Sequence, residues 1–145
     1  HVIVANIGRK KVDMNRARID PDQAIDASAL SIWDKYHAFI NCAKDRVVLE
    51  HGAGLLIDVH GVSSHSQQWV ELGYAISKTN LNKNDAGLNA VSPKGSVANL
   101  AATSGVPFSE LIRGATSFGG LLDATYHVVP SPTEPGPGTD GYFTG

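Results

Sequence analysis

The chain has one cysteine and almost no net charge, and each of these two shortages excludes a class of protein. Cys42 stands alone, so no disulfide can form within the chain, and a cysteine-rich zinc site is excluded. Twelve Lys and Arg against fourteen Asp and Glu leave a net charge of -2, so no sequence-wide positive field exists to hold a nucleic-acid backbone. We therefore expect no nucleic-acid partner.

Long apolar runs are also missing. No run approaches the roughly 18 apolar residues that a membrane helix needs, and the N-terminus lacks the apolar segment of a signal peptide. We therefore expect a soluble chain with no membrane partner. Its localisation, in the cytoplasm or secreted, is left open by the sequence.

The composition that is present is typical of one folded domain. The 145 residues are 42% apolar and 18% charged, which fits a globular chain. At that length, folding removes roughly 68 to 70% of the unfolded surface from water, which is enough for a core without metal or disulfide. We expect residues 1–145 to form a single domain.

The first part of the chain predicts two strands joined by a helix. Apolar, β-branched runs predict buried strands at 2–7 and 55–59. Between them, Asp20 as a cap with a following proline predicts the start of a helix over 21–46. We expect this helix to pack on a sheet of the two strands through Trp33, Tyr36 and Ile40, in a right-handed crossover.

The rest of the chain predicts shorter elements. Four of the seven prolines fall between 130 and 137 and predict an extended tail that is not a linker. Strands that alternate with helices predict an α/β class. The expected elements are a strand or extended segment at 69–77, a polar loop at 78–94, short helices at 96–102, 107–113 and 117–124, and a strand at 126–129.

Two groups of polar residues are candidates for chemistry. Arg9, Asn15 and Arg16 offer guanidinium and amide donors that suit a carboxylate or a developing oxyanion, although the same spacing also fits a solvated basic loop. Asp58 and His60 lie at the C-terminal end of an apolar predicted strand, where α/β sheets place ligand sites, although ordinary polar packing explains such a pair too. His65 and Glu71 could join His60 around a metal, but their spacing matches no known helix-borne ligand pair.

Seven motifs together resemble the N-formylglutamate amidohydrolase family, in the same order and over nearly the whole chain. That family is similar in fold to the zinc carboxypeptidases. The motifs are Arg9-x-x-x-Asp13-x-Asn15-Arg16, LLIDVHG (55–61), ELGY (71–74), LIRG (111–114), SFGGLL (117–122), VPSPTEPGP (129–137) and GYFTG (141–145).

The resemblance implies a mixed sheet flanked by helices, of the phosphorylase/hydrolase-like kind found in zinc carboxypeptidases. It also implies amide or formamide hydrolysis by a zinc-activated water, with a small carboxylate or acylated amino acid as the ligand. His60 would be a zinc ligand and Arg9 a catalytic residue that stabilises the oxyanion. Asn15 and Arg16 would clamp the substrate carboxylate.

The sequence also departs from the family. The family has a His-x-x-Glu zinc pair upstream of the first motif and a catalytic Glu downstream of the last, and these 145 residues contain neither. One imidazole cannot hold a catalytic zinc, which usually has three protein ligands. We expect the central portion of a longer enzyme, a site that another chain or segment completes, or a binding or structural protein without the reaction. An N-terminal copper site at His1 is a weaker alternative.

Overall fold

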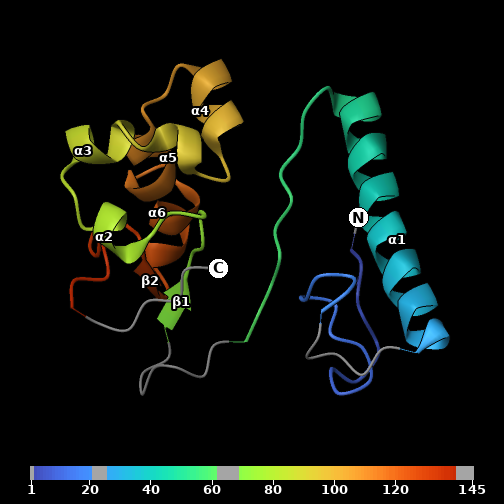
Figure 1. Ribbon diagram of the computed structural model, residues 1–145. Helices are drawn as coiled ribbons and strands as arrows, with labels where there is room; N and C mark the ends of the chain where they lie inside the picture. Colours follow the sequence, from blue (N-terminus) through green and yellow to red (C-terminus); the bar gives the residue numbers. More distant parts are fainter. Residues whose placement is uncertain (1, 21–25, 62–68, 140–145) are drawn as a thin grey trace. The chain divides into compact units, whose positions relative to one another are not determined.

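A computed structural model of the protein describes residues 2–20, 26–61 and 69–139 (Figure 1). Contacts along the chain divide it into two compact units, residues 1–59 and residues 60–145, and each is described by itself. The single domain expected over residues 1–145 stays a prediction.

One long helix dominates the first unit. Helix α1 spans Ala27–His51. It begins where the side chain of Asp26 accepts a hydrogen bond from the backbone N–H of Ala29 at 2.7 Å, and it ends at Gly52, whose φ of 75° places it in the left-handed region. The predicted end at 46 is therefore too early, and the predicted start at 21 lies outside the described residues.

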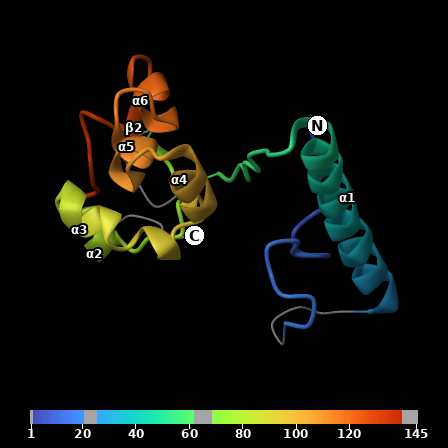
Figure 2. The same ribbon diagram turned by 90° about the horizontal axis from the view of Figure 1, so that it is seen from above.

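Helix α1 packs against the segment that precedes it, which loops beside its N-terminal half in two views (Figures 1 and 2). The indole Nε1 of Trp33 donates to the carbonyl oxygen of Arg16 at 3.1 Å. Arg18 donates to both carboxylate oxygens of Asp34, at 2.7 and 3.0 Å. No residue of α1 is fully buried. The Trp33 face of the helix thus covers a loop and not the predicted sheet.

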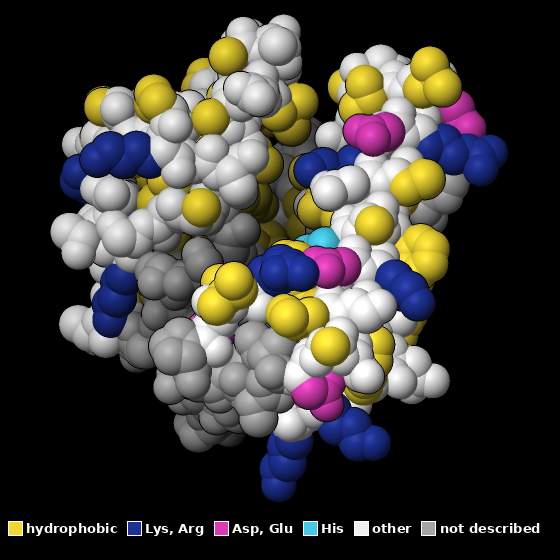
Figure 3. All heavy atoms as spheres, turned by 45° about the vertical axis from the view of Figure 1, so that its right-hand side comes forward, with side chains coloured by type: hydrophobic (Ala, Val, Ile, Leu, Met, Phe, Trp, Pro, Cys, Tyr) yellow, Lys and Arg dark blue, Asp and Glu magenta, His cyan; other side chains and the backbone are white. Residues whose placement is uncertain are grey.

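The predicted strands at 2–7 and 55–59 are wrong, and so is the crossover that was to join them. Both segments lack regular secondary structure, and the described part of this unit contains no strand. Leu55, Leu56 and Val59 are 63%, 61% and 85% exposed. A strand needs a neighbouring strand to bond its N–H and C=O groups, and an apolar run does not supply one. Figure 3 shows hydrophobic side chains at the surface among charged ones.

The second unit is a cluster of short helices around a small core. The segment predicted as a loop at 78–94 is wrong, because α2 (Lys78–Leu81), α3 (Asp85–Asn89) and the 3₁₀ helix η1 (Ser92–Lys94) lie there. Asn84 caps α3 through a hydrogen bond from Gly87 N–H at 2.9 Å, a local signal that the sequence contains. The helices bury one apolar cluster, which consists of Ile76, Leu81, Leu88, Phe108 and Ile112.

The three short helices predicted further on are confirmed, with slightly different bounds. They are α4 (Ala98–Ser104), α5 (Phe108–Arg113) and α6 (Phe118–Asp123). Helix α5 contacts α3, α4 and α6, and α6 contacts the sheet. Burial in the cluster raises the pKa of Tyr74, which packs against the core, to about 12.

The sheet of this unit has two parallel strands, β1 (Trp69–Glu71) and β2 (His127–Val129). Trp69 pairs with His127 and stacks on its ring, with centroids 4.4 Å apart. The last predicted strand is therefore confirmed, and the segment predicted at 69–77 is a strand only over its first three residues. The tail after β2 is irregular as far as it is described, as predicted.

The described chain thus combines helices with a small parallel sheet, which agrees with the α/β class at a coarse level. No helix in the described ranges has the length and the apolar character that crossing a bilayer requires.

Candidate functional site

The predicted site residues of the first unit meet around one carboxylate, that of Asp13. Arg9 donates from Nε to Oδ2 of Asp13 at 2.7 Å, and the backbone N–H of Asn15 donates to Oδ1 at 3.0 Å. Nε of Arg16 lies 3.8 Å from Oδ2. The structure therefore brings Arg9, Asn15 and Arg16 together on one turn.

The arginine side chains of the turn are exposed, whereas the carboxylate of Asp13 between them is mostly buried. The side chain of Asp13 is 14% exposed, whereas those of Arg9 and Arg16 are 72% and 47% exposed. Partial burial alone would raise the pKa of Asp13. The hydrogen bonds from Arg9 and the Asn15 backbone, with the charges of both arginines, outweigh it and lower that pKa below its ordinary value.

Several donors of this turn have no partner among the described residues. Arg9 is bonded through Nε alone, so its two terminal amino groups face solvent, and the side-chain amide of Asn15 makes no described hydrogen bond. Between residues 9 and 20 the sequence has five basic and two acidic side chains, in a chain whose net charge is -2. The turn is therefore a local basic site with free hydrogen-bond donors.

Side chains of helix α1 contact the backbone of the turn. Val12 is buried, at 4% exposure. The carbonyl oxygen of Met14 lies 3.2 Å from Nε2 of His37, and that of Arg16 accepts from Trp33. The rings of Trp33 and His37 pack on each other with centroids 3.8 Å apart. The backbone that follows Asp13 is thus anchored to one face of the helix.

The other predicted site residues lie elsewhere in the first unit, in the second unit or outside the described ranges. Asp58 is exposed in the first unit and belongs to no helix or strand. His60 is exposed at the start of that unit, and Glu71 is half-buried at the end of β1. His65 and His1 lie outside the described residues. Convergence of His60 with Arg9, Asn15 and Arg16 on one pocket stays a prediction.

The residues that could hold zinc were compared with what zinc requires. A catalytic zinc usually has three protein ligands. Within residues 2–20, 26–61 and 69–139, no three His, Cys, Asp or Glu side chains are grouped so that they could hold a metal ion. The described side chains therefore do not fit the zinc centre that the resemblance implies for His60.

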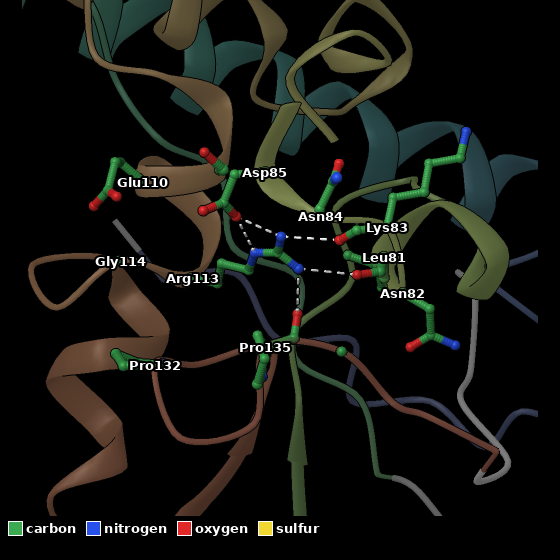
Figure 4. A pocket seen from close by; sticks show the side chains of 12 residues that line it. Leu81, Asn82, Lys83, Asn84, Asp85, Glu110, Arg113, Gly114, Pro132 and Pro135 are labelled. Atoms are coloured by element: carbon green, nitrogen blue, oxygen red, sulfur yellow. Dashed lines mark hydrogen bonds and ion pairs between the residues drawn. The ribbon is translucent and has the colours of Figure 1, made fainter. Parts of the chain in front are cut away.

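The second unit contains a cavity of about 540 Å³ beside Arg113 (Figure 4). It lies between α2, α3, α5 and the proline-rich tail. Nε and Nη2 of Arg113 donate to Oδ1 of Asp85, Nη2 also donates to Lys83 O, and Nη1 donates to Leu81 O and Pro135 O. Arginine has five N–H donors, and these five bonds use all of them.

Arg113 is therefore a structural residue. Its side chain is only 9% exposed, and an anion in the cavity would have to displace one of its present acceptors. The carbonyl oxygens of α2 and of the tail would then lose their donor at a cost of roughly 1 to 3 kcal/mol each. The cavity offers little to an anionic ligand.

Sequence reasoning missed Asp13 and Arg113 as the centres of these two networks. Asp13 stands four residues after Arg9 and three before Arg16, a spacing that places all three on one turn once the chain reverses. Arg113 is the only arginine in the sequence of the second unit, and it directly follows the apolar Leu111 and Ile112. An arginine in an apolar helix signals a buried charge that needs acceptors.

Comparisons with family models, with curated proteins and with solved structures gave no match to this chain. The resemblance to the N-formylglutamate amidohydrolase family therefore rests on the seven motifs alone.

Proposed function

We propose that the turn of Arg9, Asn15 and Arg16 binds the carboxylate of a small acylated amino acid such as N-formylglutamate. In this proposal the chain is the central portion of an N-formylglutamate amidohydrolase-like protein, with a mixed sheet flanked by helices as in the zinc carboxypeptidases. Arg9 would stabilise an oxyanion, and Asn15 with Arg16 would clamp the carboxylate.

The observation that supports the proposal most is the free donor capacity of the turn. Arg9 and Arg16 share Asp13 as a neighbour, and Nη1 of Arg16 also lies 3.5 Å from Oδ2 of Asp20. Both terminal amino groups of Arg9 remain without a described partner. A guanidinium fork matches the two oxygens of a carboxylate, and such charge-assisted bonds are the stronger kind. A small carboxylate could bind the fork of Arg9 without breaking the hydrogen bonds that shape the turn.

The shortage of metal ligands around His60 limits the proposed function to binding without hydrolysis. His60 supplies one imidazole, and the described side chains offer no group of three metal ligands around it. We therefore propose that these 145 residues bind the acylated amino acid without turning it over, and that hydrolysis needs a further chain or segment that completes the site.

The test is a calorimetric titration of the purified chain with N-formylglutamate, at low salt and neutral pH. We expect saturable binding that weakens about tenfold or more in Arg9→Ala and in Arg16→Ala, since each removes a charge-assisted bond of roughly 1.5 to 3 kcal/mol. In parallel, we expect formate release to stay at background with or without added zinc.

Arg46→Ala is the matched control. Arg46 is 64% exposed and donates from Nε to Glu50 at 2.7 Å, the same pairing that Arg9 makes with Asp13, but it lies near the far end of α1. Its removal should leave affinity unchanged. Absence of saturation at ligand concentrations up to about 10 mM, or equal losses in Arg46→Ala, would defeat the binding proposal. Robust zinc-dependent hydrolysis that His60→Ala abolishes would contradict the proposal that these 145 residues bind the ligand without hydrolysing it.

A further inference from the structure

We propose that Asp13 is a positioning residue of this site, which holds Arg9 by its Nε so that the terminal fork of Arg9 stays presented to the ligand. The inference rests on the proposed function of the turn as a carboxylate site. It assigns a role to an acidic side chain in a place where an anion-binding site would be expected to have none.

The geometry distinguishes positioning from simple neutralisation. Oδ2 of Asp13 takes the Nε–H of Arg9, which leaves both terminal amino groups of that guanidinium open. Nε of Arg16 lies 3.8 Å from the same oxygen, and Nη1 of Arg16 lies 3.5 Å from Oδ2 of Asp20. A carboxylate that competed with the ligand would occupy the fork, where two parallel bonds can form.

Asp13 can act in this way because its own position is fixed. Its Oδ1 accepts from the backbone N–H of Asn15, and its neighbours Val12 and Met14 are held by burial and by His37 on α1. The chain of contacts runs from α1 to the turn, from the turn to Asp13, and from Asp13 to Arg9.

The energetic gain is preorganisation. Arg9 is 72% exposed, and a free arginine on a surface loses much of its rotamer freedom when it binds a ligand. Because the bond to Asp13 already restricts the guanidinium, less of that cost remains to be met on binding. Asp13 therefore raises affinity for a carboxylate although its charge repels one.

Substitution of Asp13 by Asn distinguishes positioning from neutralisation, because the two roles change the affinity for N-formylglutamate in opposite directions. Asp13→Asn keeps the shape and an acceptor for the Asn15 N–H, but it removes the charge that holds Arg9. If Asp13 positions Arg9, affinity for N-formylglutamate falls about tenfold even though the site becomes more positive. If Asp13 only neutralises the arginines, affinity rises or stays the same, and the inference is overturned.

A second comparison asks whether Asp13 acts through Arg9. In an Arg9→Ala background the Asp13→Asn change should cost less than twofold, because the residue that it positions is gone. An equal loss in both backgrounds would mean that Asp13 merely supports the turn, and this too would overturn the inference. Near-ultraviolet circular dichroism, recorded in a Trp69→Phe background so that Trp33 is the one remaining tryptophan, reports whether the turn stays docked, because Trp33 bonds Arg16.

Glu50→Gln is the control, because it removes the same kind of Nε partner from Arg46. It should leave affinity unchanged. A wild-type chain that does not bind N-formylglutamate would defeat the proposed function itself, whereas binding by the wild type with no loss in Asp13→Asn would defeat only the role of Asp13.

Discussion

Two arginines of this protein show how the surroundings of a guanidinium decide its use. Arg113 is 9% exposed and donates all five of its N–H groups to protein acceptors. Arg9 is 72% exposed and is held by one nitrogen. The first is committed to the structure of its unit, and the second is available for a ligand.

This difference predicts the effect of mutation at Arg113. We expect Arg113→Ala to lower the free energy of unfolding of the second unit by about 2 kcal/mol, because three carbonyl oxygens and Asp85 lose their donor. Arg113→Lys should recover only part of this, since an ammonium group has three donors where five are used. Urea unfolding followed by circular dichroism measures both.

Lys94→Ala is the control in the same unit, since the side chain of Lys94 is exposed and has no described partner. It should change the free energy of unfolding by less than about 0.5 kcal/mol. An Arg113→Ala chain as stable as Lys94→Ala would show that the five hydrogen bonds contribute nothing net.

At the scale of the element, the stability of α1 depends more on the hydrogen bonds at its two ends than on the packing of its side chains. None of its residues is fully buried, so packing contributes less than in an ordinary core helix. Its N-terminus is capped by Asp26, and its C-terminus ends at Gly52, whose N–H donates to Val48 O at 2.8 Å. The bounds of the helix are therefore set by local backbone chemistry.

Gly52→Ala tests the C-terminal end. The φ of 75° at this position is costly for any residue with a side chain, and no atom within 4 Å would meet an added Cβ. We expect a loss of about 1 kcal/mol in helix stability, seen as a lower helical signal in a thermal melt monitored by circular dichroism.

Gly8→Ala is the matched change, because Gly8 also has open space around it but no positive φ. It should leave the melt unchanged or stabilise the chain slightly. Equal melts for the two variants would mean that the left-handed conformation of Gly52 does not limit α1.

At the scale of the whole molecule, the two units differ in how much they bury. In the described part of the first unit, Val12 is the one buried apolar side chain, at 4% exposure. The second unit buries a connected cluster of Ile76, Leu81, Leu88, Phe108 and Ile112, and both valines of β2 as well. Apolar burial is the main favourable term in folding.

We therefore expect residues 60–145, expressed alone, to unfold cooperatively on heating, and residues 1–59 alone to lose helix gradually without a sharp transition. Differential scanning calorimetry of the two pieces measures this. A sharp transition in residues 1–59, or none in residues 60–145, would show that the amount of buried apolar surface does not decide which unit unfolds cooperatively.

The sequence by itself determined the elements whose signals are local. The spacing of Trp33, Tyr36 and Ile40 predicted a helix, and the short helices α4, α5 and α6 and the strand β2 lie close to their expected places. The grouping of Arg9, Asn15 and Arg16 was also predicted from their residue types and spacing, because all three belong to one turn.

Only the tertiary structure decided what depends on partners distant in the chain. The runs at 2–7 and 55–59 are apolar enough for strands, yet a strand exists only where a second strand bonds it, as β2 bonds β1. The role of Arg113 depends on acceptors from three segments, and that of Asp13 on a turn anchored to α1. Composition states which donors and acceptors the chain has, but folding decides which of them meet.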